Sequence, residues 1–411
     1  MRTEILALVM AGGEGSRLFP LTAERSKPAV PFGGRYRLVD FVLSNLVNSG
    51  VHAIYLLVQY QSLSLIEHVR RAWLTTPHIF QRHFITLVPP QKSAGMGWFQ
   101  GTANAVFQNL NLVRELEPEV VAVFGSDHVY RMDVRQMLAF HREREADVTV
   151  AATPTPLDRG NALGIIVAEP HGRIRGFQEK PESPAPMPGR PDSCYASMGN
   201  YLFRADVLYH ALEEAENRGD YDFGKDVIPK LVGTHRVYAY DFSTNRLPGG
   251  AANNQPYWRD VGDIESYFAA NQDMLGEEPR FDEFRVDWPV CADYYSGPVA
   301  KILGGRIEDS LLGGGVLIRH ATVRRSVIRR QVLIDEGAEV EDCIIIGFTR
   351  IGRGARLRRV IVDRCNVIKP NTVIGYDREA DARRFFVSAS GIVVTRRGLC
   401  AHRPVEDLYR R

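Results

Sequence analysis

Residues 8–34 of the chain read LVMAGGEGSRLFPLTAERSKPAVPFGG, and an apolar run that starts at Ile5 leads into them. The length of this run predicts a buried strand. Glycines follow it directly, at Gly12, Gly13 and Gly15. Glycines after a strand let the main chain approach a phosphate closely and point N–H groups at it. With Arg17 and Lys27 beside them, these residues predict a polyphosphate-binding loop.

An ordinary tight turn and a dinucleotide-binding fold are the alternatives for these glycines. The dinucleotide fingerprint requires a glycine where Arg17 lies and an acidic residue at the end of the second strand. The second strand is expected at residues 53–58, and it runs into Gln59 and Tyr60. No Gly-Lys-Ser/Thr follows the glycines, which argues against a P-loop. The polyphosphate interpretation is therefore favoured.

Length and composition narrow the class of protein. The 411 residues are enough for two or three domains, and the net charge of +2 argues against a general nucleic-acid binder. The five cysteines are widely spaced and form no CxxC motif, which predicts neither a disulfide framework nor a structural zinc site. The apolar start is too short for a signal peptide, and no segment is long enough to span a membrane. A reducing cytoplasm is the expected location.

Short aliphatic runs alternate with amphipathic stretches over roughly the first 240 residues. This alternation predicts an α/β domain with a mainly parallel sheet. The expected strands are residues 5–10, 53–58, 120–124, 148–152 and 164–168. Helices are expected at residues 63–74 and 103–115. The expected domain boundaries are 1–277 for this domain, 278–304 for a linker and 305–411 for a second domain.

Aliphatic residues recur after about residue 305 with spacings of 6, 6 and 5, so the pattern closes every 17 residues. Three short faces per coil, each pointing one aliphatic side chain inward, describe a triangular parallel β-helix. A β-sandwich would instead show strict alternation of apolar and polar residues. The open ends of such a prism should pack on the first domain or on another subunit. The three columns are Leu311, Ile328, Ile345 and Val362; Leu317, Ile334, Ile351 and Ile368; and Val323, Val340, Leu357 and Ile374.

Two aspartates are candidate metal ligands. Asp127 follows the strand expected at residues 120–124, and open α/β sheets bind ligands at the carboxyl ends of their strands. A carboxylate there suits Mg²⁺, which takes oxygen ligands, whereas a helix N-cap is the structural alternative. Asp260 is a candidate second ligand, and a salt bridge to the neighbouring Arg259 is its alternative.

Lys180 and Ser197 are candidates for binding a sugar phosphate. Lys180 precedes a proline, which favours an extended or turn conformation that would present the ammonium to a phosphate monoester. A solvated surface lysine is the alternative. The sequence has no Ser/His/Asp arrangement or catalytic cysteine signature, and none is required. A sugar phosphate is largely a dianion near neutral pH and can attack an α-phosphorus directly, so positioning and charge neutralisation supply the catalysis.

Short motifs throughout the chain carry a resemblance to a known family. They are AGGEGSRL, KPAVPFGG, RLVDFVLSN, QYQSLSL, GTANAV, GSDHVY, EKP, ASMGNYLF, DFGKDVIPK and YWRDVG. The chain resembles bacterial glucose-1-phosphate adenylyltransferases (ADP-glucose pyrophosphorylases), in particular the actinobacterial branch, over nearly its whole length. The resemblance implies a GT-A/Rossmann-like nucleotidyltransferase domain followed by a C-terminal left-handed parallel β-helix.

The resemblance also implies the activity. ATP and α-D-glucose 1-phosphate would give ADP-glucose and diphosphate for glycogen or α-glucan synthesis, with Mg²⁺ as cofactor. The enzyme would be a cytoplasmic homotetramer regulated by phosphorylated metabolites, with no nucleic-acid or membrane partner.

The resemblance further implies roles for individual residues. ATP would be bound by Gly12, Gly13, Gly15, Gly101 and Thr102, the last two beside the adenine. The catalytic residues would be Arg17, Lys27, Asp127 and Lys180, and the metal ligands Asp127 and Asp260. Glucose 1-phosphate would contact Phe99, Gly164, Glu179, Lys180 and Ser197. Effectors would be bound by Arg25, Arg37, Arg364 and Arg396.

Some residues depart from the family pattern. Phe99 replaces a tyrosine, Asn104 an aspartate and Asp263 a threonine, which puts substrate preference and rate in doubt rather than reaction type. Acidic or neutral residues stand where the family has basic effector-binding ones, at Glu24, Glu115 and Cys400. An acidic residue there would repel a sugar bisphosphate. The sequence therefore predicts weak or no activation by fructose 1,6-bisphosphate.

Three other functions stay open on the sequence. The first is a non-catalytic regulatory subunit, which the intact Arg17, Asp127, Lys180 and Asp260 oppose. The second is a pyrophosphorylase for another sugar 1-phosphate, such as glucosamine 1-phosphate, because adenine and glucose are implied by the resemblance alone. The third is a β-helix acyltransferase, for which His320 is the one histidine in the repeat.

Overall fold

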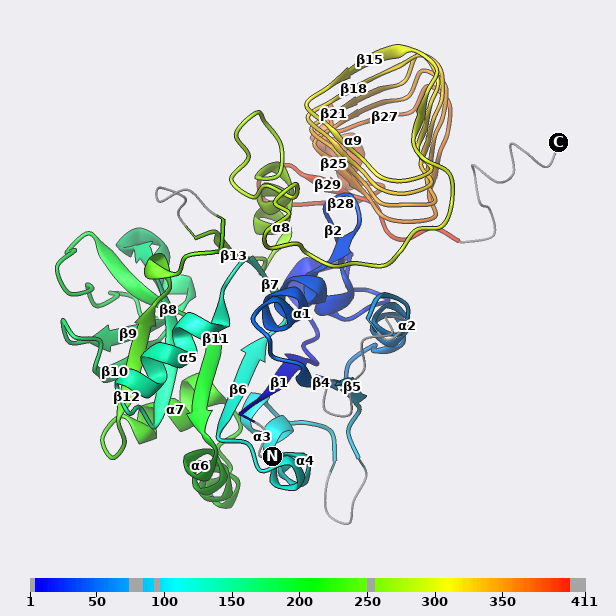
Figure 1. Cartoon of the computed structure of the whole chain (residues 1–411). Helices are drawn as coiled ribbons and strands as arrows, with labels where there is room; N and C mark the ends of the chain where they lie inside the picture. The colour runs from blue at the N-terminus through cyan, green and yellow to red at the C-terminus, as the bar shows by residue number, and fades with distance from the viewer. Residues whose placement is uncertain (1–3, 74–83, 92–96, 250–255, 400–411) are drawn as a thin grey trace.

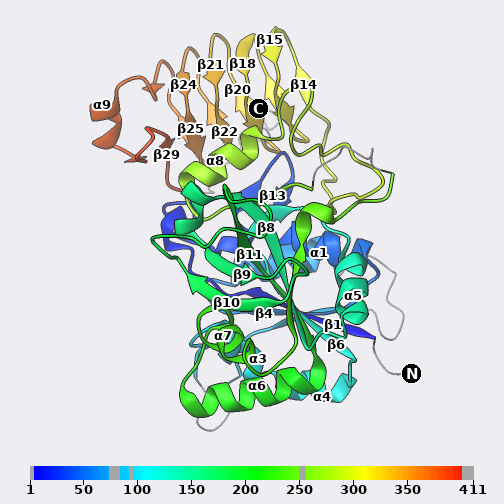
Figure 2. The ribbon, with the colours of Figure 1, turned by 90° about the vertical axis from the view of Figure 1, so that its left-hand side faces the viewer.

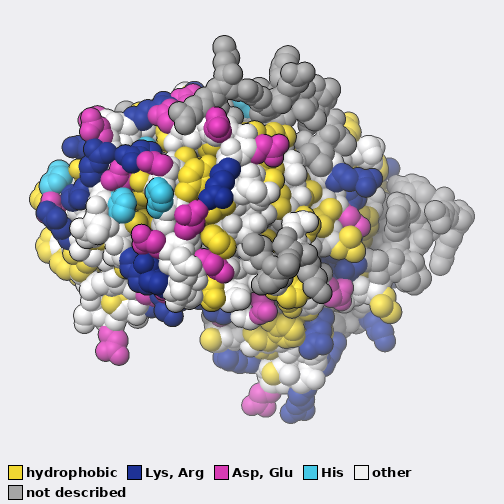
Figure 3. Space-filling model, turned by 90° about the horizontal axis from the view of Figure 1, so that it is seen from below, with side chains coloured by type: hydrophobic (Ala, Val, Ile, Leu, Met, Phe, Trp, Pro, Cys, Tyr) yellow, Lys and Arg dark blue, Asp and Glu magenta, His cyan; other side chains and the backbone are white. Residues whose placement is uncertain are grey.

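The computed structural model describes residues 4–73, 84–91, 97–249 and 256–399. In these ranges the chain forms an α/β domain with a stack of short β-strand coils beside it, as Figures 1 and 2 show from two sides. None of the helices described is both long and apolar enough to cross a membrane. Acidic and basic side chains are interspersed on the face shown in Figure 3, unlike the basic stripe typical of a nucleic-acid binder.

A mixed sheet of nine strands forms the centre of the α/β domain. Its strands are β1 (Ile5–Ala11), β4 (Ala53–Val58), β5 (Phe84–Val88), β6 (Val120–Gly125), β8 (Val148–Pro156), β9 (Gly164–Ala168), β10 (Ile174–Glu179), β11 (Ser193–Arg204) and β12 (Val237–Asp241). β6, β1, β4 and β5 are neighbours and parallel, as a βαβ alternation requires. β11 runs antiparallel to β6, β8 and β9, and β12 lies parallel to β8.

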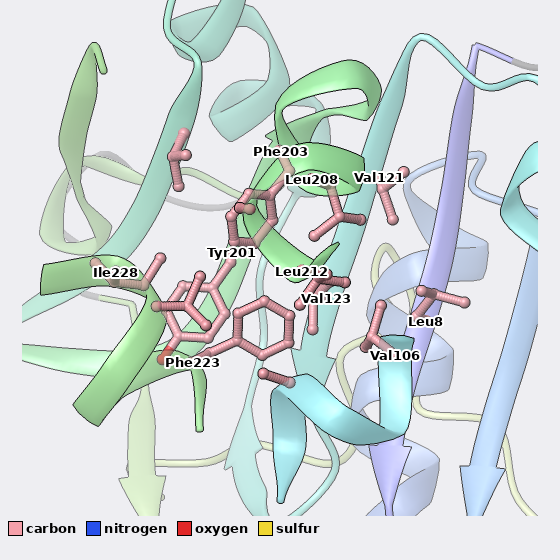
Figure 4. Close-up of a cluster of buried hydrophobic side chains, with 14 of the residues drawn as sticks. Leu8, Val106, Val121, Val123, Tyr201, Phe203, Leu208, Leu212, Phe223 and Ile228 are labelled. Carbon is pink, nitrogen blue, oxygen red and sulfur yellow. The ribbon is translucent and has the colours of Figure 1, made fainter. Parts of the chain in front are cut away.

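Helices cover both faces of this sheet, which explains why its strands read as continuous apolar runs. Successive side chains of a strand point to opposite faces. Leu8 packs with α3, α6 and α7 in the cluster drawn in Figure 4, whereas Val9 packs with α1, α2 and α5 on the other face. The helices are α1 (Leu38–Asn48), α2 (Leu63–Ala72), α3 (Thr102–Phe107), α4 (Leu110–Leu116), α5 (Val134–Glu143), α6 (Ala205–Arg218) and α7 (Ile228–Leu231).

The predicted strands are confirmed, but the helix predicted at 103–115 is interrupted between α3 and α4. Asn109 lies at the break, and its side-chain nitrogen donates to the carbonyl of Ala105 at 2.8 Å. Asparagine side chains compete with the main chain for such carbonyls, which disfavours an unbroken helix. The helix predicted at 63–74 ends at Ala72, and residue 74 lies outside the described residues.

Three parallel sheets of very short strands build the second domain. The first contains β14 (Lys301–Ile302), β17 (Leu317–Ile318), β20 (Leu333–Ile334), β23 (Arg350–Ile351) and β26 (Val367–Ile368). The second contains β15 (Gly305–Glu308), β18 (Ala321–Arg324), β21 (Glu339–Glu341), β24 (Arg356–Arg358) and β27 (Val373–Ile374). The third contains β16 (Leu311–Leu312), β19 (Val327–Ile328), β22 (Ile344–Ile345), β25 (Val360–Val362), β29 (Val393–Val394) and β28 (Phe386–Val387). The arrangement is consistent with the expected left-handed parallel β-helix.

Two of the predicted columns are wrong by one residue in the first coil. Leu312, not Leu311, pairs with Ile328, and Ile318, not Leu317, pairs with Ile334. The first coil is therefore one residue shorter than the next, in which Ile328 pairs with Ile345. Leu311 instead faces the α/β domain, where it packs at the edge of the apolar cluster between the two domains.

The β-helix packs on the α/β domain along the side formed by its third sheet, whereas the sequence predicted a contact through one of its open ends. One apolar cluster joins Phe32 and Leu18 to Ile344 and Ile361 across the junction. It includes residues of β2 (Pro31–Phe32), β3 (Tyr36–Arg37) and α8 (Ile264–Gln272). Arg329 donates to the carbonyls of Phe32 and Gly33, at 2.5 and 2.7 Å. At the far end of the helix α9 (Arg378–Ala382) and the β28–β29 hairpin close the last coil.

The cysteines do not form a disulfide framework among the described residues. Cys194, Cys291 and Cys343 are free, but Cys365 is disulfide-bonded, which the sequence did not predict. Burial raises the pKa of the Cys343 thiol to about 12, so this thiol is inert at neutral pH.

Candidate active site

A cavity of about 550 Å³ opens where the parallel strands β1, β4 and β6 end. Most of the predicted site residues line it: Gly12, Gly13, Lys27, Phe99, Gly101, Thr102, Asp127, Gly164, Glu179, Lys180, Ser197 and Asp260. Its volume lies within the range of about 300–1,000 Å³ typical of small-molecule sites. The structure therefore brings together residues from both predicted substrate sites, although they lie up to 248 residues apart (Gly12 to Asp260).

The pairing of two short strands brings the two candidate metal ligands together. β7 (His128–Tyr130) runs antiparallel to β13 (Trp258–Asp260), and Asp260 lies opposite His128. The Lys27 ammonium lies 2.8 Å from Asp127 Oδ2 and 3.7 Å from Asp260 Oδ1. His128 Nε2 lies 3.1 Å from Asp127 Oδ1. Two carboxylates and a buried cation thus form one charge cluster in the cavity.

The charges of this cluster stabilise one another. Burial by itself would raise the pKa of Asp127, but His128 and Lys27 outweigh it and hold that pKa well below its usual value. Burial would likewise lower the pKa of Lys27, but Asp127 and Asp260 raise it above its usual value. At neutral pH the site therefore contains an ionised carboxylate beside a protonated lysine.

The same cluster fits a divalent cation, which nucleotidyltransferases of this kind generally use. Atoms of Asp127, His128 and Asp260 lie within 4.8 Å of one another. Carboxylate oxygens are the ligands that Mg²⁺ and similar hard cations take, and the cavity leaves room for waters and phosphates. His128 Nδ1 is buried without a described hydrogen-bond partner. A metal ion bound here would compete with the Lys27 ammonium for the same oxygens.

The glycine loop holds Lys27 in place. Gly15 has φ 65°, and a Cβ there would lie only 2.8 Å from Lys27 Cβ, so the position requires glycine. Thr22 Oγ1 donates to the Gly15 carbonyl at 2.9 Å. Gly15 and Arg17 do not line the cavity. Arg17 nevertheless lies near the carboxylates, because a Cβ on Gly262 would meet both Asp260 Oδ2, at 2.8 Å, and Arg17 Nη2, at 3.3 Å.

The opposite wall of the cavity carries the predicted sugar-phosphate residues. Lys180 is exposed, and its ammonium lies 3.2 Å from Glu179 Oε1. A Cβ on Gly164 would lie 2.7 Å from the Phe177 ring and 3.2 Å from Glu179 Oε2, so a larger residue would displace both. Ser197 Oγ accepts from the Gly199 main chain at 3.3 Å. This wall therefore offers a hydroxyl, a carboxylate and a mobile cation.

The predicted adenine segment is anchored by another loop. A Cβ on Gly101 would overlap the Tyr221 carbonyl, so only glycine permits this close approach. Thr102 Oγ1 donates to Asp222 Oδ2 at 3.1 Å and accepts from the Phe223 main chain at 3.0 Å. The motif DFGKDVIPK, which begins at Asp222, thus meets the motif GTANAV at the cavity.

Some residues that line the cavity received no role from the sequence. They are Gln59, His128, Tyr201, Asp222, Phe223 and Trp258. Gln59 fixes the loop before Gly101 because its side-chain amide bonds to both the main-chain N–H and the carbonyl of Phe99. Their motifs were recognisable, but only the tertiary contacts bring these side chains to the cavity.

Of the three departures from the family pattern, only Phe99 lines the cavity. Asn104 is buried away from it, and its side-chain nitrogen donates to Glu216 Oε2 of α6 at 3.0 Å. Asp263 caps the N-terminus of α8 by accepting from Ser266 N at 2.8 Å. Packing and helix capping therefore account for Asn104 and Asp263.

Two of the four predicted effector residues line one small cavity, and Arg25 lies close enough for its charge to act on both of them. Arg37 and Arg364 line a small cavity of about 40 Å³ at the domain junction, together with Arg35, Arg329 and Arg330. We call this cavity the arginine pocket. Arg25 lies outside it, paired with the carboxylate of Asp363, and Arg396 stacks over Phe19. Glu24 pairs with Arg397 at 2.8 Å, and Cys400 lies outside the described residues.

Comparisons with known proteins agree with this architecture. Residues 6–277 match the family model for nucleotidyl transferases, and residues 300–395 match that for the GlmU-like C-terminal hexapeptide. The fold and the two family models thus define a nucleotidyl transferase that carries a hexapeptide β-helix.

Curated relatives narrow the family further. A glucose-1-phosphate adenylyltransferase of Thermodesulfovibrio yellowstonii is 51% identical over 95% of both chains. That of Thermus thermophilus is 45% identical over 97% of this chain and 99% of the relative. That of Corynebacterium jeikeium is 44% identical over 95% of this chain and 97% of the relative. The chain belongs to the glucose-1-phosphate adenylyltransferase family.

Proposed function

We propose that the chain joins ATP and α-D-glucose 1-phosphate to form ADP-glucose and diphosphate, for glycogen or α-glucan synthesis. The observation that carries this proposal is that one cavity is lined by the glycine loop, by the carboxylate pair and by Glu179, Lys180 and Ser197. Membership of the glucose-1-phosphate adenylyltransferase family supports the choice of both substrates.

In the proposed reaction a phosphate oxygen of glucose 1-phosphate attacks the α-phosphorus of ATP. The new P–O bond forms as the bond to the departing diphosphate breaks, and no covalent enzyme intermediate is needed. Gly12 and Gly13 hold the triphosphate, Arg17 and Lys27 neutralise charge on it, and Lys180 holds the sugar phosphate. Asp127 and Asp260 would hold Mg²⁺, which would neutralise charge on the phosphate oxygens as a Lewis acid.

We assign the regulatory role to the arginine pocket, where Arg37 and Arg364 would meet the phosphate of an effector. Arg25 and Arg396 were predicted to share this role, and they would act from outside the pocket. The Glu24–Arg397 ion pair and the internal pairing of Arg25 support the expectation of weak or no activation by fructose 1,6-bisphosphate.

We also propose that the chain works as a cytoplasmic homotetramer. Val299, Ile302 and Leu303 are exposed at the first coil of the β-helix. β14 pairs only with β17 among the described strands, so its other edge is open. Apolar side chains beside an open strand edge favour burial against another subunit.

Diphosphate release measured across a panel of nucleoside triphosphates and sugar 1-phosphates tests the proposed reaction. We expect ATP with glucose 1-phosphate to give the highest kcat/KM, with the purified chain alone. Glucosamine 1-phosphate as the preferred sugar would contradict the substrate assignment. No release with any pair would indicate a non-catalytic regulatory subunit, and consumption of acetyl-CoA would indicate an acyltransferase.

A further inference from the structure

The arginine pocket holds more positive charge than its surroundings neutralise. Burial, together with the charges of neighbouring arginines, lowers the pKa of Arg37 to about 9. The same causes lower the pKa of Arg329 and of Arg364 to about 10. Arg364 Nε is buried without a described hydrogen-bond partner. Such a cluster gains stability from any anion that enters it.

One anion from the chain itself already lies in this pocket. Asp293 is the one carboxylate among the described lining residues, and its Oδ2 lies 2.9 Å from Arg330 Nη1. The Asp293 side chain is only 12% exposed, so water screens the pair weakly. The guanidinium groups of Arg330 and Arg364 lie 5.9 and 5.3 Å from the centre of the Phe348 ring, and all three side chains line the same cavity.

A phosphate group that bonds Arg330 must compete with Asp293 for the same guanidinium group. The other charged groups that line the pocket are held by the fold. Arg329 is fixed by the carbonyls of Phe32 and Gly33, and Arg37 by Ser64. Asp293 is held from the linker by a single ion pair and is therefore the group most readily displaced.

We propose that Asp293 is a built-in plug of the arginine pocket, an intramolecular carboxylate that a phosphorylated metabolite must displace from Arg330 before it binds. This inference rests on the regulatory role proposed above for the pocket. The competing carboxylate lowers the affinity of the pocket for a phosphorylated metabolite. This competition is a second reason to expect weak activation by sugar bisphosphates.

The linker that carries Asp293 also contacts the active-site side of the molecule. Trp288 Nε1 donates to Asn45 Oδ1 at 3.0 Å, and Cys291 N donates to Ser44 Oγ at 2.9 Å. Asn45 in turn donates to the carbonyl of Tyr130 at 3.1 Å, in the strand that begins with His128. Displacement of the plug thus acts on a segment that is bonded to α1 and, through it, to β7.

Anion binding to the Asp293→Asn variant tests the plug. Asparagine keeps the shape but removes the charge, so we expect inorganic phosphate and fructose 1,6-bisphosphate to bind at least tenfold more tightly than to the wild type by isothermal titration calorimetry. Asp287→Asn is the matched control, because Asp287 is an acidic residue of the same linker that does not line the pocket. An Asp293→Asn variant that binds neither anion more tightly than the wild type overturns the proposal.

A second variant ties the gain to this pocket. Adding Arg364→Met to Asp293→Asn should abolish the tighter binding, and a gain that survives this change would place the anion elsewhere and overturn the proposal. ADP-glucose formation is measured on the same wild-type preparation. If the wild type forms no ADP-glucose while Asp293→Asn still binds phosphate more tightly, the proposed reaction is wrong and the plug stands. If the wild type forms ADP-glucose but Asp293→Asn binds phosphate no more tightly, only the plug is rejected.

Discussion

The candidate active-site cavity and the arginine pocket both contain clustered cations, but they differ in charge balance and in size. In the active site Lys27 and Arg17 face the carboxylates of Asp127 and Asp260, and the cavity has about 550 Å³. In the arginine pocket five guanidinium groups face one carboxylate, and the cavity has about 40 Å³. Carboxylates and cations are thus matched within the candidate active site, whereas the arginines of the pocket share one lining carboxylate, which the linker supplies.

The largest expected effect comes from breaking the balance in the active site. Asp127→Asn removes one of the two carboxylates next to Lys27, and turnover should fall by about 10²–10³, the usual cost of losing one preorganised charge contact. Steady-state kinetics with saturating Mg²⁺ measure it, and circular dichroism should show an intact fold. Asp263→Asn is the control, since asparagine also caps a helix well. An Asp127→Asn enzyme with a third of the wild-type activity would refute the metal assignment.

The second largest effect is expected for the ion pair of Arg25 and Asp363, which lies beside the arginine pocket. Arg25 and Asp363 are almost fully buried at the domain junction, with both guanidinium nitrogens 3.0 Å from the carboxylate oxygens. Arg25→Met leaves Asp363 buried without its partner and should lower the free energy of unfolding by about 3–5 kcal/mol. Thermal denaturation measures the loss. The double variant Arg25→Met/Asp363→Leu should recover much of the lost stability. Equal melting temperatures for the wild type and Arg25→Met would show that this ion pair does not stabilise the fold.

A smaller effect is expected at the rim of the arginine pocket. With Asp293 inside and Glu24 paired to Arg397, fructose 1,6-bisphosphate should raise the wild-type kcat/KM less than tenfold. Glu24→Lys restores the basic residue that some family members have and should increase the response, because it removes a charge that repels the bisphosphate. Saturation kinetics with and without the effector measure both. Tenfold or greater activation of the wild type would contradict the prediction.

The smallest effect on activity is expected at Asn104, away from both cavities. Asn104→Asp would turn a hydrogen bond to Glu216 into a contact of two carboxylates and should cost about 1–3 kcal/mol of stability. The ratio of kcat/KM values for glucose 1-phosphate and glucosamine 1-phosphate should change less than twofold. Adding Glu216→Gln should restore stability. A large change in sugar preference would mean that Asn104 does influence the active site.

The central strands β1, β4, β6 and the first half of β8 could be predicted because each contains an apolar run that is almost wholly buried. The strands β5, β10 and β11 are more exposed, and the sequence did not predict them. The break between α3 and α4 could not be predicted, since it depends on the local bond that Asn109 makes. The register of the first coil could not be predicted from the sequence either. Leu311 and Leu312 are similarly apolar, and so are Leu317 and Ile318. Only the ladder of main-chain hydrogen bonds decides which of each pair points inward.

The candidate site was predictable where strand ends fix position. Asp127 could be proposed because it follows an expected strand, whereas Asp260 was proposed as a second carboxylate and from the family motif, without an expected strand to place it. Gln59 and Phe223 could not be proposed, since their roles depend on contacts with Phe99 and Thr102 in other segments. The arginine pocket combines side chains from the α/β domain, from the linker and from three coils of the β-helix, and no linear spacing shows that Arg330 and Asp293 meet.

The hydrogen bonds from Arg329 to the carbonyls of Phe32 and Gly33 make part of the α/β domain depend on the β-helix. The same short segment carries Lys27 at one end and these hydrogen bonds at the other, and the apolar cluster around Phe32 is completed by Ile344 and Ile361. A truncation after residue 277 would keep every residue that lines the cavity. It would also remove the β-helix contacts that hold the segment carrying Lys27. The catalytic domain therefore depends on the β-helix for its local structure, although the cavity itself lies within the α/β domain.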